Sequence, residues 1–543
     1  MLFSLVCPLI KTTDMNISIK ETLLVLAIAA VSACACAKGE KPSGNGGNGG
    51  EIAGNTTVKI SPDRKTVLKN PLNGWVMYVS GTADPSYFDT KIYVSELGKE
   101  VYVRDYASAC YIRTGWKNLN PAKGKYAWDD PTSSIYKLVK RAEELELPIA
   151  FRVVVDGRDQ RENTPQFVFD DGAEYWLSDS KYPDRKTPLA VDPIWRKHYE
   201  TFVKAFAERF NDPKKTAFID AYGLGKWGEG HNVCYEQNNA VSDKTSEYKA
   251  ETMQWITKLY ADNFTKVPLV INYHRQIGHP VSEGKNPQPD SERVLQIALD
   301  NGYCLRSDAI GMNNQDWGYN DWEKAYAKKW AYKVPILMEG GYIVSSHSYW
   351  NDPAGYRKGH PEDVRAGEFN SSMEAKVNTM DFRVGDETKS WFENAFEYVE
   401  RFVAEGGYRL YPTSVSFPSQ VKFGDRVTVG HSWANLGWGY CPVNLPQWNY
   451  KYKAAVALLD SKNKPVKVFV EADADLSKWL KGEISSYKTE VEIKGVAVGA
   501  YTWAVGIVDT MQDNAIGIRP AATAKSVTED GWVRAGAVTV SAR

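Results

Sequence analysis

Two glutamates stand at positions where a carboxylate is costly unless a function or a partner requires it. Glu229 lies in the glycine-rich stretch 222–232, and Glu339 directly follows the apolar residues 335–338. Hydrolysis of a glycosidic bond needs two facing carboxylates: one protonates the leaving oxygen, and the other attacks the anomeric carbon or activates water. An ion pair with a nearby Arg or Lys is the alternative explanation for each glutamate. The pair suggests carbohydrate chemistry, provided that the fold brings the two side chains together.

Residues that could hold a sugar lie near the ends of the same apolar runs. Amides, His and Arg can bind sugar hydroxyls, and aromatic rings can stack on the apolar faces of sugars; the chain has 18 Trp and 31 Tyr. The candidates are Arg113, Trp116, Arg152, Trp227, His231, Asn232, Asn272, Tyr273, His274, Asn313, Trp317 and Tyr342. Core packing is the alternative for the aromatics and His274, and a structural ion pair is the alternative for Arg152. We interpret Asp308 and Asp316 as loop caps.

The elements that must position these residues alternate between short apolar strands and amphipathic helices. Strands are expected at 74–79, 109–114, 149–155, 217–223, 269–274, 309–313, 336–339 and 408–411. Helices are expected at 133–145, 195–210, 252–264, 293–301, 322–331 and 391–403. This order predicts an α/β fold, a (β/α)8 TIM barrel, whose active-site face lies at the carboxyl ends of the strands. A doubly wound open sheet is the alternative, but no GxGxxG motif opens a helix after a strand.

One segment carries a family resemblance. Residues 113–128, RTGWKNLNPAKGKYAW, are similar to the W…P…G.Y.W stretch after strand two in clan A glycoside hydrolases. The resemblance covers about residues 70–411, and it implies that Glu229 is the acid/base and Glu339 the nucleophile of a retaining enzyme. Many members have Asn directly before the acid/base, where this chain has Gly228, so His231, Asn232 or another amide must replace it.

The surroundings of the two glutamates add two expectations. Trp227 should partly desolvate Glu229 and raise its pKa, as suits a proton donor. Arg113 or Tyr342 should stabilise the Glu339 carboxylate as an anion. Both expectations depend on the predicted barrel.

The chain divides into four parts. Residues 56–412 form the predicted barrel, and residues 413–543 show short strands and turns without helical periodicity, which predicts a β-sandwich. This part resembles the sandwich appended to barrel-type lipoproteins of glycan-degrading bacteria, and we expect it to have no active site of its own.

The first 55 residues have the pattern of a targeting signal followed by a flexible linker. An apolar core at 23–31 ends in Val31-Ser32-Ala33-Cys34, which resembles a bacterial lipobox, so residues 1–33 are predicted to be a lipoprotein signal peptide and Cys34 the lipidated residue. Residues 34–55 are predicted to be a flexible tether. An ordinary signal peptide is the alternative. We expect an exported protein, attached to the bacterial outer membrane only through this lipid, on its periplasmic or cell-surface side.

Composition excludes some function classes. The 66 Lys and Arg balance the 67 Asp and Glu to a net charge of −1, which argues against a nucleic-acid partner. The seven Cys form no CxxC pair or zinc-ligand pattern, so we expect no metal and no cofactor, although one disulfide is possible. The leading hypothesis is a glycoside hydrolase acting on a carbohydrate. The alternatives are a non-catalytic glycan-binding lipoprotein and, with little support, a lyase or esterase; the oligomeric state stays open.

Overall fold

The computed structural model describes residues 52–156, 163–177, 185–281, 286–312, 318–342, 344 and 360–543. The predicted signal peptide, Cys34 and most of the tether lie outside these residues, as do Asn313 and Trp317. Among the helices of the described ranges, none combines the length and the apolar character that crossing a bilayer requires.

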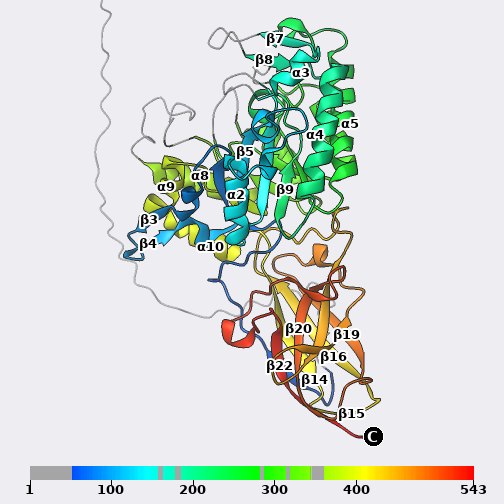
Figure 1. Ribbon diagram of the computed structural model, residues 1–543. Coiled ribbons are helices and arrows are strands. Elements are labelled where there is room, and N and C mark those ends of the chain that lie inside the picture. Colours follow the sequence, from blue (N-terminus) through cyan, green and yellow to red (C-terminus); the bar gives the residue numbers. More distant parts are fainter. Residues whose placement is uncertain are drawn as a thin grey trace, which may run out of the picture. The chain divides into compact units, whose positions relative to one another are not determined.

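Eight parallel strands close into a barrel, which confirms the predicted fold class (Figure 1). Each strand is a short run of buried residues, as parallel strands covered on both sides require. Around the barrel the strands are β2 (Gly74–Ser80), β5 (Ala107–Gly115), β6 (Ile149–Val154), β9 (Thr216–Asp220), β10 (Leu269–Asn272), β11 (Tyr303–Ser307), β12 (Ile336–Met338) and β13 (Thr379–Asp381).

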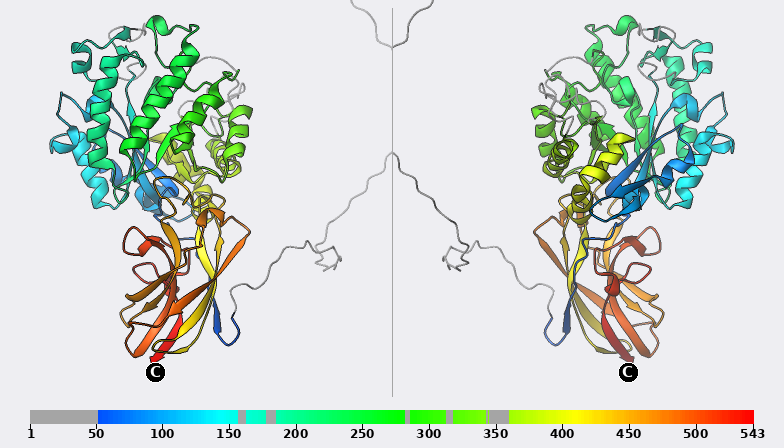
Figure 2. Two further views of the ribbon diagram at one scale, coloured as in Figure 1. Left: turned by 90° about the vertical axis from the view of Figure 1, so that its right-hand side faces the viewer. Right: turned by 90° about the vertical axis from the view of Figure 1, so that its left-hand side faces the viewer.

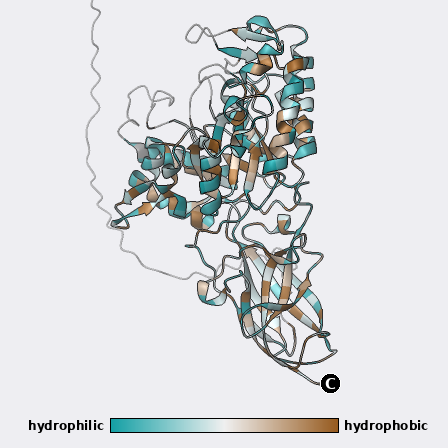
Figure 3. Ribbon diagram, viewed as in Figure 1, coloured by the Kyte–Doolittle hydropathy of each residue, from teal (hydrophilic) through white to brown (hydrophobic). Residues whose placement is uncertain are grey.

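Helices form the outer layer of the barrel in all views (Figures 1 and 2). They are α1 (Trp116–Leu119), α2 (Ser134–Glu144), α3 (Gln166–Asp170), α4 (Pro193–Phe210), α5 (Thr245–Asn263), α6 (Ser291–Asp300), α7 (Asp321–Trp330), α8 (Pro361–Glu374), α9 (Asp386–Asn394) and α10 (Phe396–Glu405). Side-chain caps fix where some begin: the Ser133 hydroxyl accepts from the Tyr136 N–H at the start of α2. Single helices carry both teal and brown in Figure 3, as amphipathic elements do.

Two of the predicted strands were misplaced. The sixth strand is Tyr303–Ser307 and not 309–313, because a buried Arg306 interrupts the apolar run that marks a strand. The eighth is the three-residue strand Thr379–Asp381 and not 408–411, which overlaps the first long strand of the C-terminal sheets. The other six predicted barrel strands coincide with observed ones to within a few residues.

Two sheets form the C-terminal part and share one apolar core, which confirms the predicted β-sandwich. The first sheet holds β1 (Thr56–Lys59), β14 (Leu410–Phe417), β16 (Arg426–Asn435) and β19 (Ile484–Glu492). The second holds β15 (Gln420–Lys422), β22 (Val533–Ser541), β20 (Gly499–Asp509), β17 (Tyr452–Leu459), β18 (Pro465–Val470) and β21 (Ala515–Ile518). By its pairing with β14, β1 belongs to this sandwich, although it precedes the barrel in sequence.

Two short β-hairpins are present in the barrel segment in addition to its eight strands. They are β3 (Lys91–Val94) with β4 (Lys99–Tyr102), and β7 (Tyr175–Leu177) with β8 (Lys186–Pro188). Neither contributes a residue to the site described below.

The barrel and the sandwich are joined by hydrogen bonds between buried groups. The Trp438 indole donates to the Val377 carbonyl at 2.9 Å, and the Asn378 amide donates to the Tyr440 carbonyl at 2.9 Å. The four described cysteines, Cys110, Cys234, Cys304 and Cys441, are buried free thiols, so the possible disulfide does not form among them.

Candidate active site

Glu339 lies at the centre of the carboxyl end of the barrel. It directly follows β12, and its side chain is fully buried. Arg152 Nη2 lies 2.7 Å from one carboxylate oxygen and Arg383 Nη1 lies 2.6 Å from the other, while Arg306 Nη1 also contacts the carboxylate. Burial opposes ionisation, but the three guanidinium charges outweigh it and hold the pKa of Glu339 well below its usual range. Glu339 is therefore an anion at neutral pH.

Glu229 also contacts Arg152, which thus pairs with both glutamates. It follows β9, at the end of the single 3-10 turn Lys226–Gly228. Arg152 Nη1 lies 3.0 Å from its Oε1, and His231 Nε2 lies 3.5 Å from its Oε2. Burial raises the pKa of Glu229, yet the His231 hydrogen bond and the Arg152 charge more than compensate and leave it lowered. The expectation of a raised pKa next to Trp227 was therefore wrong.

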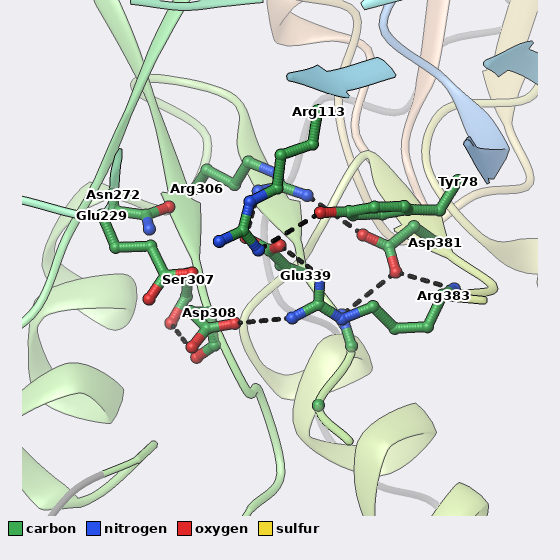
Figure 4. Close-up of polar contacts among 12 residues, drawn as sticks. Tyr78, Arg113, Glu229, Asn272, Arg306, Ser307, Asp308, Glu339, Asp381 and Arg383 are labelled. Atoms are coloured by element: carbon green, nitrogen blue, oxygen red, sulfur yellow. Dashed lines mark hydrogen bonds and ion pairs between the residues drawn. The ribbon is translucent and has the colours of Figure 1, made fainter. Parts of the chain in front are cut away.

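Asp308 is the third carboxylate of the site. It follows β11, its side chain is 30% exposed, and Arg383 Nη2 lies 3.5 Å from its Oδ1. One oxygen from each of Glu229, Asp308 and Glu339 lies within 4.8 Å of the other two. Partial burial and the charges of Glu229 and Glu339 raise the pKa of Asp308 well above its usual value, although the charges of Arg383 and Arg152 act in the opposite direction. Figure 4 shows Asp308 between Glu229 and Arg383.

Two further carboxylates, Asp220 and Asp381, hold the arginines in place. Arg152 Nε lies 2.7 Å from Asp220 Oδ2, and the Tyr111 hydroxyl donates to the same oxygen at 2.9 Å. Arg306 Nη2 lies 3.0 Å from Asp381 Oδ2 (Figure 4). Arg152 and Arg306 therefore each have a carboxylate partner besides Glu339 and Glu229, which fixes the orientation of the guanidinium.

The three carboxylates have the spacing of a cation site, but their partners argue against one. Guanidinium groups contact both oxygens of Glu339 and one oxygen of Glu229. A cation would have to displace these groups and withstand their positive charge. The contacts of Glu339 and Glu229 are therefore better explained as ion pairs with arginines than as ligands of a cation.

Three predicted residues surround Glu229. The His274 Nε2–H donates to the Glu229 carbonyl at 2.9 Å, and burial lowers the pKa of His274 to about 3, so its ring is neutral. The Asn272 carbonyl oxygen accepts from Arg152 Nη2 at 3.3 Å, while its buried Nδ2 has no partner among the described residues. The Trp227 ring lies 5.4 Å from the His231 ring, centroid to centroid. Asn272 therefore offers a free amide donor beside the carboxylates.

Arg113 and Tyr342 lie at the edge of the site. Arg113 Nη1 donates to the Tyr78 hydroxyl at 3.5 Å and affects Glu339 through its charge, without a direct bond (Figure 4). The Arg383 guanidinium lies 4.8 Å from the centre of the Tyr342 ring, whose residue is 40% exposed. Arginines other than Arg113 therefore supply the direct contacts that stabilise the Glu339 anion.

Three other predicted contacts lie elsewhere. Trp116 is fully buried and packs edge-on against Tyr199, and Tyr273 is buried against Tyr326. The Asn232 side chain accepts from Asn239 within the loop. Trp116, Tyr273 and Asn232 therefore contact other residues and not the carboxylates.

The backbone around the carboxylates adopts an unusual conformation. Trp227, Ala309 and Arg383 are non-glycine residues with φ of 57°, 53° and 54°, in the left-handed region. Such conformations cost about 1–2 kcal/mol each and concentrate at functional sites. Gly228, where the resembled families have Asn, has φ of 75°, so a side chain there would be strained.

Sequence reasoning missed Arg306, Asp381 and Arg383, and it interpreted Asp308 as a loop cap and not as part of the site. Arg306 was missed because strand six was placed after it, and Asp381 and Arg383 because strand eight was placed beyond them. One signal could have located Arg306. It lies two residues after Cys304, so the two side chains point to the same side of a strand, here the barrel interior.

The chain resembles known proteins in its fold but not in its sequence. No family model and no curated protein matches the chain. Among solved structures, the catalytic domain of beta-amylase from Paenibacillus polymyxa superposes with a TM-score of 0.41 at 11% identity, covering 62% of this chain and 99% of that one. Endo-glycoceramidase II from Rhodococcus sp. gives 0.33 at 12% identity, covering 77% of this chain and 97% of that one. The exo-beta-1,4-mannosidase of Opitutaceae bacterium strain TAV5 gives 0.36 at 12% identity, covering 61% of this chain and 59% of that one. The likeness is a distant resemblance to barrel-type glycoside hydrolases, and at this level it carries no argument about activity.

Proposed function

We propose that the protein is a retaining glycoside hydrolase, with Glu339 as the nucleophile and Glu229 as the acid/base. The observation that carries the proposal is the carboxylate trio at the carboxyl end of the barrel. Glu339 is held ionised, and a Glu229 oxygen lies within 4.8 Å of a Glu339 oxygen. Retaining pairs are about 5–5.5 Å apart and inverting pairs about 6.5–9.5 Å, so the spacing supports retention.

The surroundings support the two chemical steps. In the first, a Glu339 oxygen forms a bond to the anomeric carbon while the leaving oxygen departs with a proton. In the second, water attacks that carbon, gives up a proton to a carboxylate and releases Glu339. The free Asn272 Nδ2–H is a candidate to hold a sugar hydroxyl, and the exposed Tyr342 ring is a candidate to stack on the sugar.

One observation favours the second candidate, a non-catalytic glycan-binding protein. Glu339 is fully buried, and guanidiniums contact both of its oxygens. Such contacts reduce the basicity of a carboxylate, and an ion-pair network of this kind also occurs in purely structural cores.

Trapping the nucleophile separates the two candidates. We would incubate the protein with a panel of 2-deoxy-2-fluoroglycosides that carry dinitrophenolate leaving groups, and digest it for mass spectrometry. A glycosyl adduct on Glu339 is the expected result. Binding of a glycan in calorimetry, with no adduct and no hydrolysis from any member of a matching aryl glycoside panel, would favour the binding protein.

A further inference from the structure

The three carboxylates differ in how well a substrate can reach them. Glu339 is fully buried, and the Glu229 side chain is 5% exposed, whereas the Asp308 side chain is 30% exposed. A proton donor must come within hydrogen-bond reach of the glycosidic oxygen of a bound substrate, so it must be accessible to that substrate. Among the three, Asp308 is the best placed for that contact.

We propose that the acid and base roles are divided between two residues: Asp308 donates the proton to the leaving oxygen, and Glu229 accepts the proton from the attacking water. This inference rests on the proposed glycoside hydrolase function. It changes only the identity of the acid, because Glu229 keeps the role of base and Glu339 that of nucleophile.

The steps balance in protons and electron pairs. As a Glu339 oxygen bonds to the anomeric carbon, the electron pair of the glycosidic bond passes to the leaving oxygen, which takes the proton of Asp308. Water then attacks the anomeric carbon, its proton goes to Glu229, and the bond to Glu339 breaks with its electron pair returning to the carboxylate. Transfer of that proton from Glu229 to Asp308 restores the starting state.

The charges around Asp308 favour its protonated form. Glu229, from the loop after β9, and Glu339, from the end of β12, both face it as anions. Arg383, which follows β13, and Arg152, on β6, oppose them, but both arginines already pair with Glu339. Protonated Asp308 beside ionised Glu229 is the arrangement in which neighbouring environments separate an acid from a base.

The backbone at Asp308 agrees with a functional position. Its successor Ala309 has φ of 53°, and the Asp308 side chain makes no hydrogen bond that would explain it as a loop cap among the described residues, apart from the 3.5 Å contact with Arg383. Strain of this kind is retained where the direction of a side chain matters.

The kinetic test compares Asp308→Asn and Glu229→Gln on aryl glycosides with good and poor leaving groups. Asp308→Asn should lose about 10²–10⁴-fold on poor leaving groups and remain close to wild type on dinitrophenolate, which needs no proton. Glu229→Gln should cleave the first bond rapidly, release a burst of phenolate and then accumulate the adduct on Glu339. Asp300→Asn, at the exposed end of α6, is the matched control and should leave both rates unchanged.

Two results would overturn the division of roles. In one, Asp308→Asn keeps wild-type activity on poor leaving groups while Glu229→Gln loses it, which assigns both roles to Glu229. In the other, the wild type hydrolyses no member of the panel and forms no adduct, and then the proposed function fails together with this inference. The first result overturns only the inference, so the two failures are distinguishable.

Infrared spectroscopy tests the protonation of Asp308 without any substrate. The infrared band of protonated carboxyl groups at neutral pH should lose one component in Asp308→Asn and none in Glu229→Gln. Buried Glu368, whose pKa is raised by burial to about 7, contributes to the band in all variants and cancels in the difference. An unchanged band in Asp308→Asn would refute the assignment of the proton.

Discussion

The two ends of the barrel interior are built from the same strands but from opposite chemistry. On five strands, an apolar residue and a polar residue two positions later both point inward, as the period of a strand requires. The pairs are Ala150 and Arg152, Phe218 and Asp220, Val270 and Asn272, Cys304 and Arg306, and Leu337 and Glu339. The apolar members belong to a cluster that continues into the sandwich. Four of the polar members form the ion-pair network, and the fifth, Asn272, accepts a hydrogen bond from Arg152.

This difference separates stability from chemistry within one barrel. Burying apolar side chains stabilises the fold at about 25 cal/mol per Å². Burying ion pairs roughly balances desolvation against attraction, so an apolar replacement is often as stable. The charged layer therefore adds little net stability compared with an apolar layer of the same volume, so substitutions in the two layers should have different effects.

The largest effect is expected from Glu339→Gln, in the charged layer. The substitution removes the nucleophile and leaves Arg152, Arg306 and Arg383 without their shared carboxylate. Activity should fall by more than the roughly 10⁴-fold upper limit for loss of an acid alone. The free energy of unfolding should fall by about 3–5 kcal/mol, measured by urea denaturation. A variant with wild-type turnover would remove Glu339 from the mechanism.

Substitutions in the apolar layer should change the free energy of unfolding but not the turnover. Leu337→Ala, two residues before Glu339, opens a cavity in the apolar layer and should lower the free energy of unfolding by about 2–5 kcal/mol. The kcat of the folded fraction should stay near wild type. If kcat instead fell as far as in Glu339→Gln, the two layers would not be separable.

Neighbouring residues on β10 and its end should differ in the same way. Asn272 points into the site, whereas Tyr273 packs outward on Tyr326. Asn272→Ala should lower kcat/KM by up to about tenfold, since a hydrogen bond between neutral groups contributes about 0.5–1.5 kcal/mol. Tyr273→Phe keeps the ring and should leave kcat/KM unchanged. Equal losses in the two variants would contradict the placement of Asn272 at the substrate.

The pH dependence of stability sharpens the distinction between Asp308 and its neighbours. The folded protein holds the Asp308 proton up to a raised pKa, whereas the unfolded chain releases it near pH ~3.9, so this group destabilises the fold increasingly as the pH rises between those values. Asp308→Asn cannot lose a proton, and its stability relative to wild type should therefore increase with pH from about 4 upward. Urea unfolding of both proteins over that range measures the trend. A difference that does not vary with pH would mean that the pKa of Asp308 is ordinary.

The smallest effect concerns the predicted lipid anchor at Cys34, which lies outside the described residues. We propose that Cys34 is the lipidated first residue of the mature protein. Cys34→Ser should release the protein from host membranes without changing kcat, which fractionation and mass spectrometry would measure. A soluble mature chain that begins elsewhere would contradict the proposal.

The sequence predicted the barrel well and its charged layer poorly. Apolar runs located six strands, and glycine-flanked glutamates located Glu229 and Glu339. The runs failed at β11 and β13, because Arg306 and Asp381 place charges inside strands that periodicity expects to be apolar. The pKa of Glu229 could not be predicted either, since it depends on Arg152 and His231, which only the folded chain brings near.

The pairing of β1 with β14 makes the sandwich a discontinuous domain. Thr56 pairs with Phe417 and Lys59 with Ser414, so the whole barrel is inserted between two neighbouring strands of one sheet. During synthesis, β1 cannot pair with β14 until the whole barrel, which lies between them in sequence, has been made. Because this pairing closes a long loop, we expect it to form late in folding. A fragment that began at residue 413 would leave one edge of β14 unpaired and open to aggregation. Dissection of the protein into independent parts should therefore carry residues 52–60 along with the C-terminal fragment.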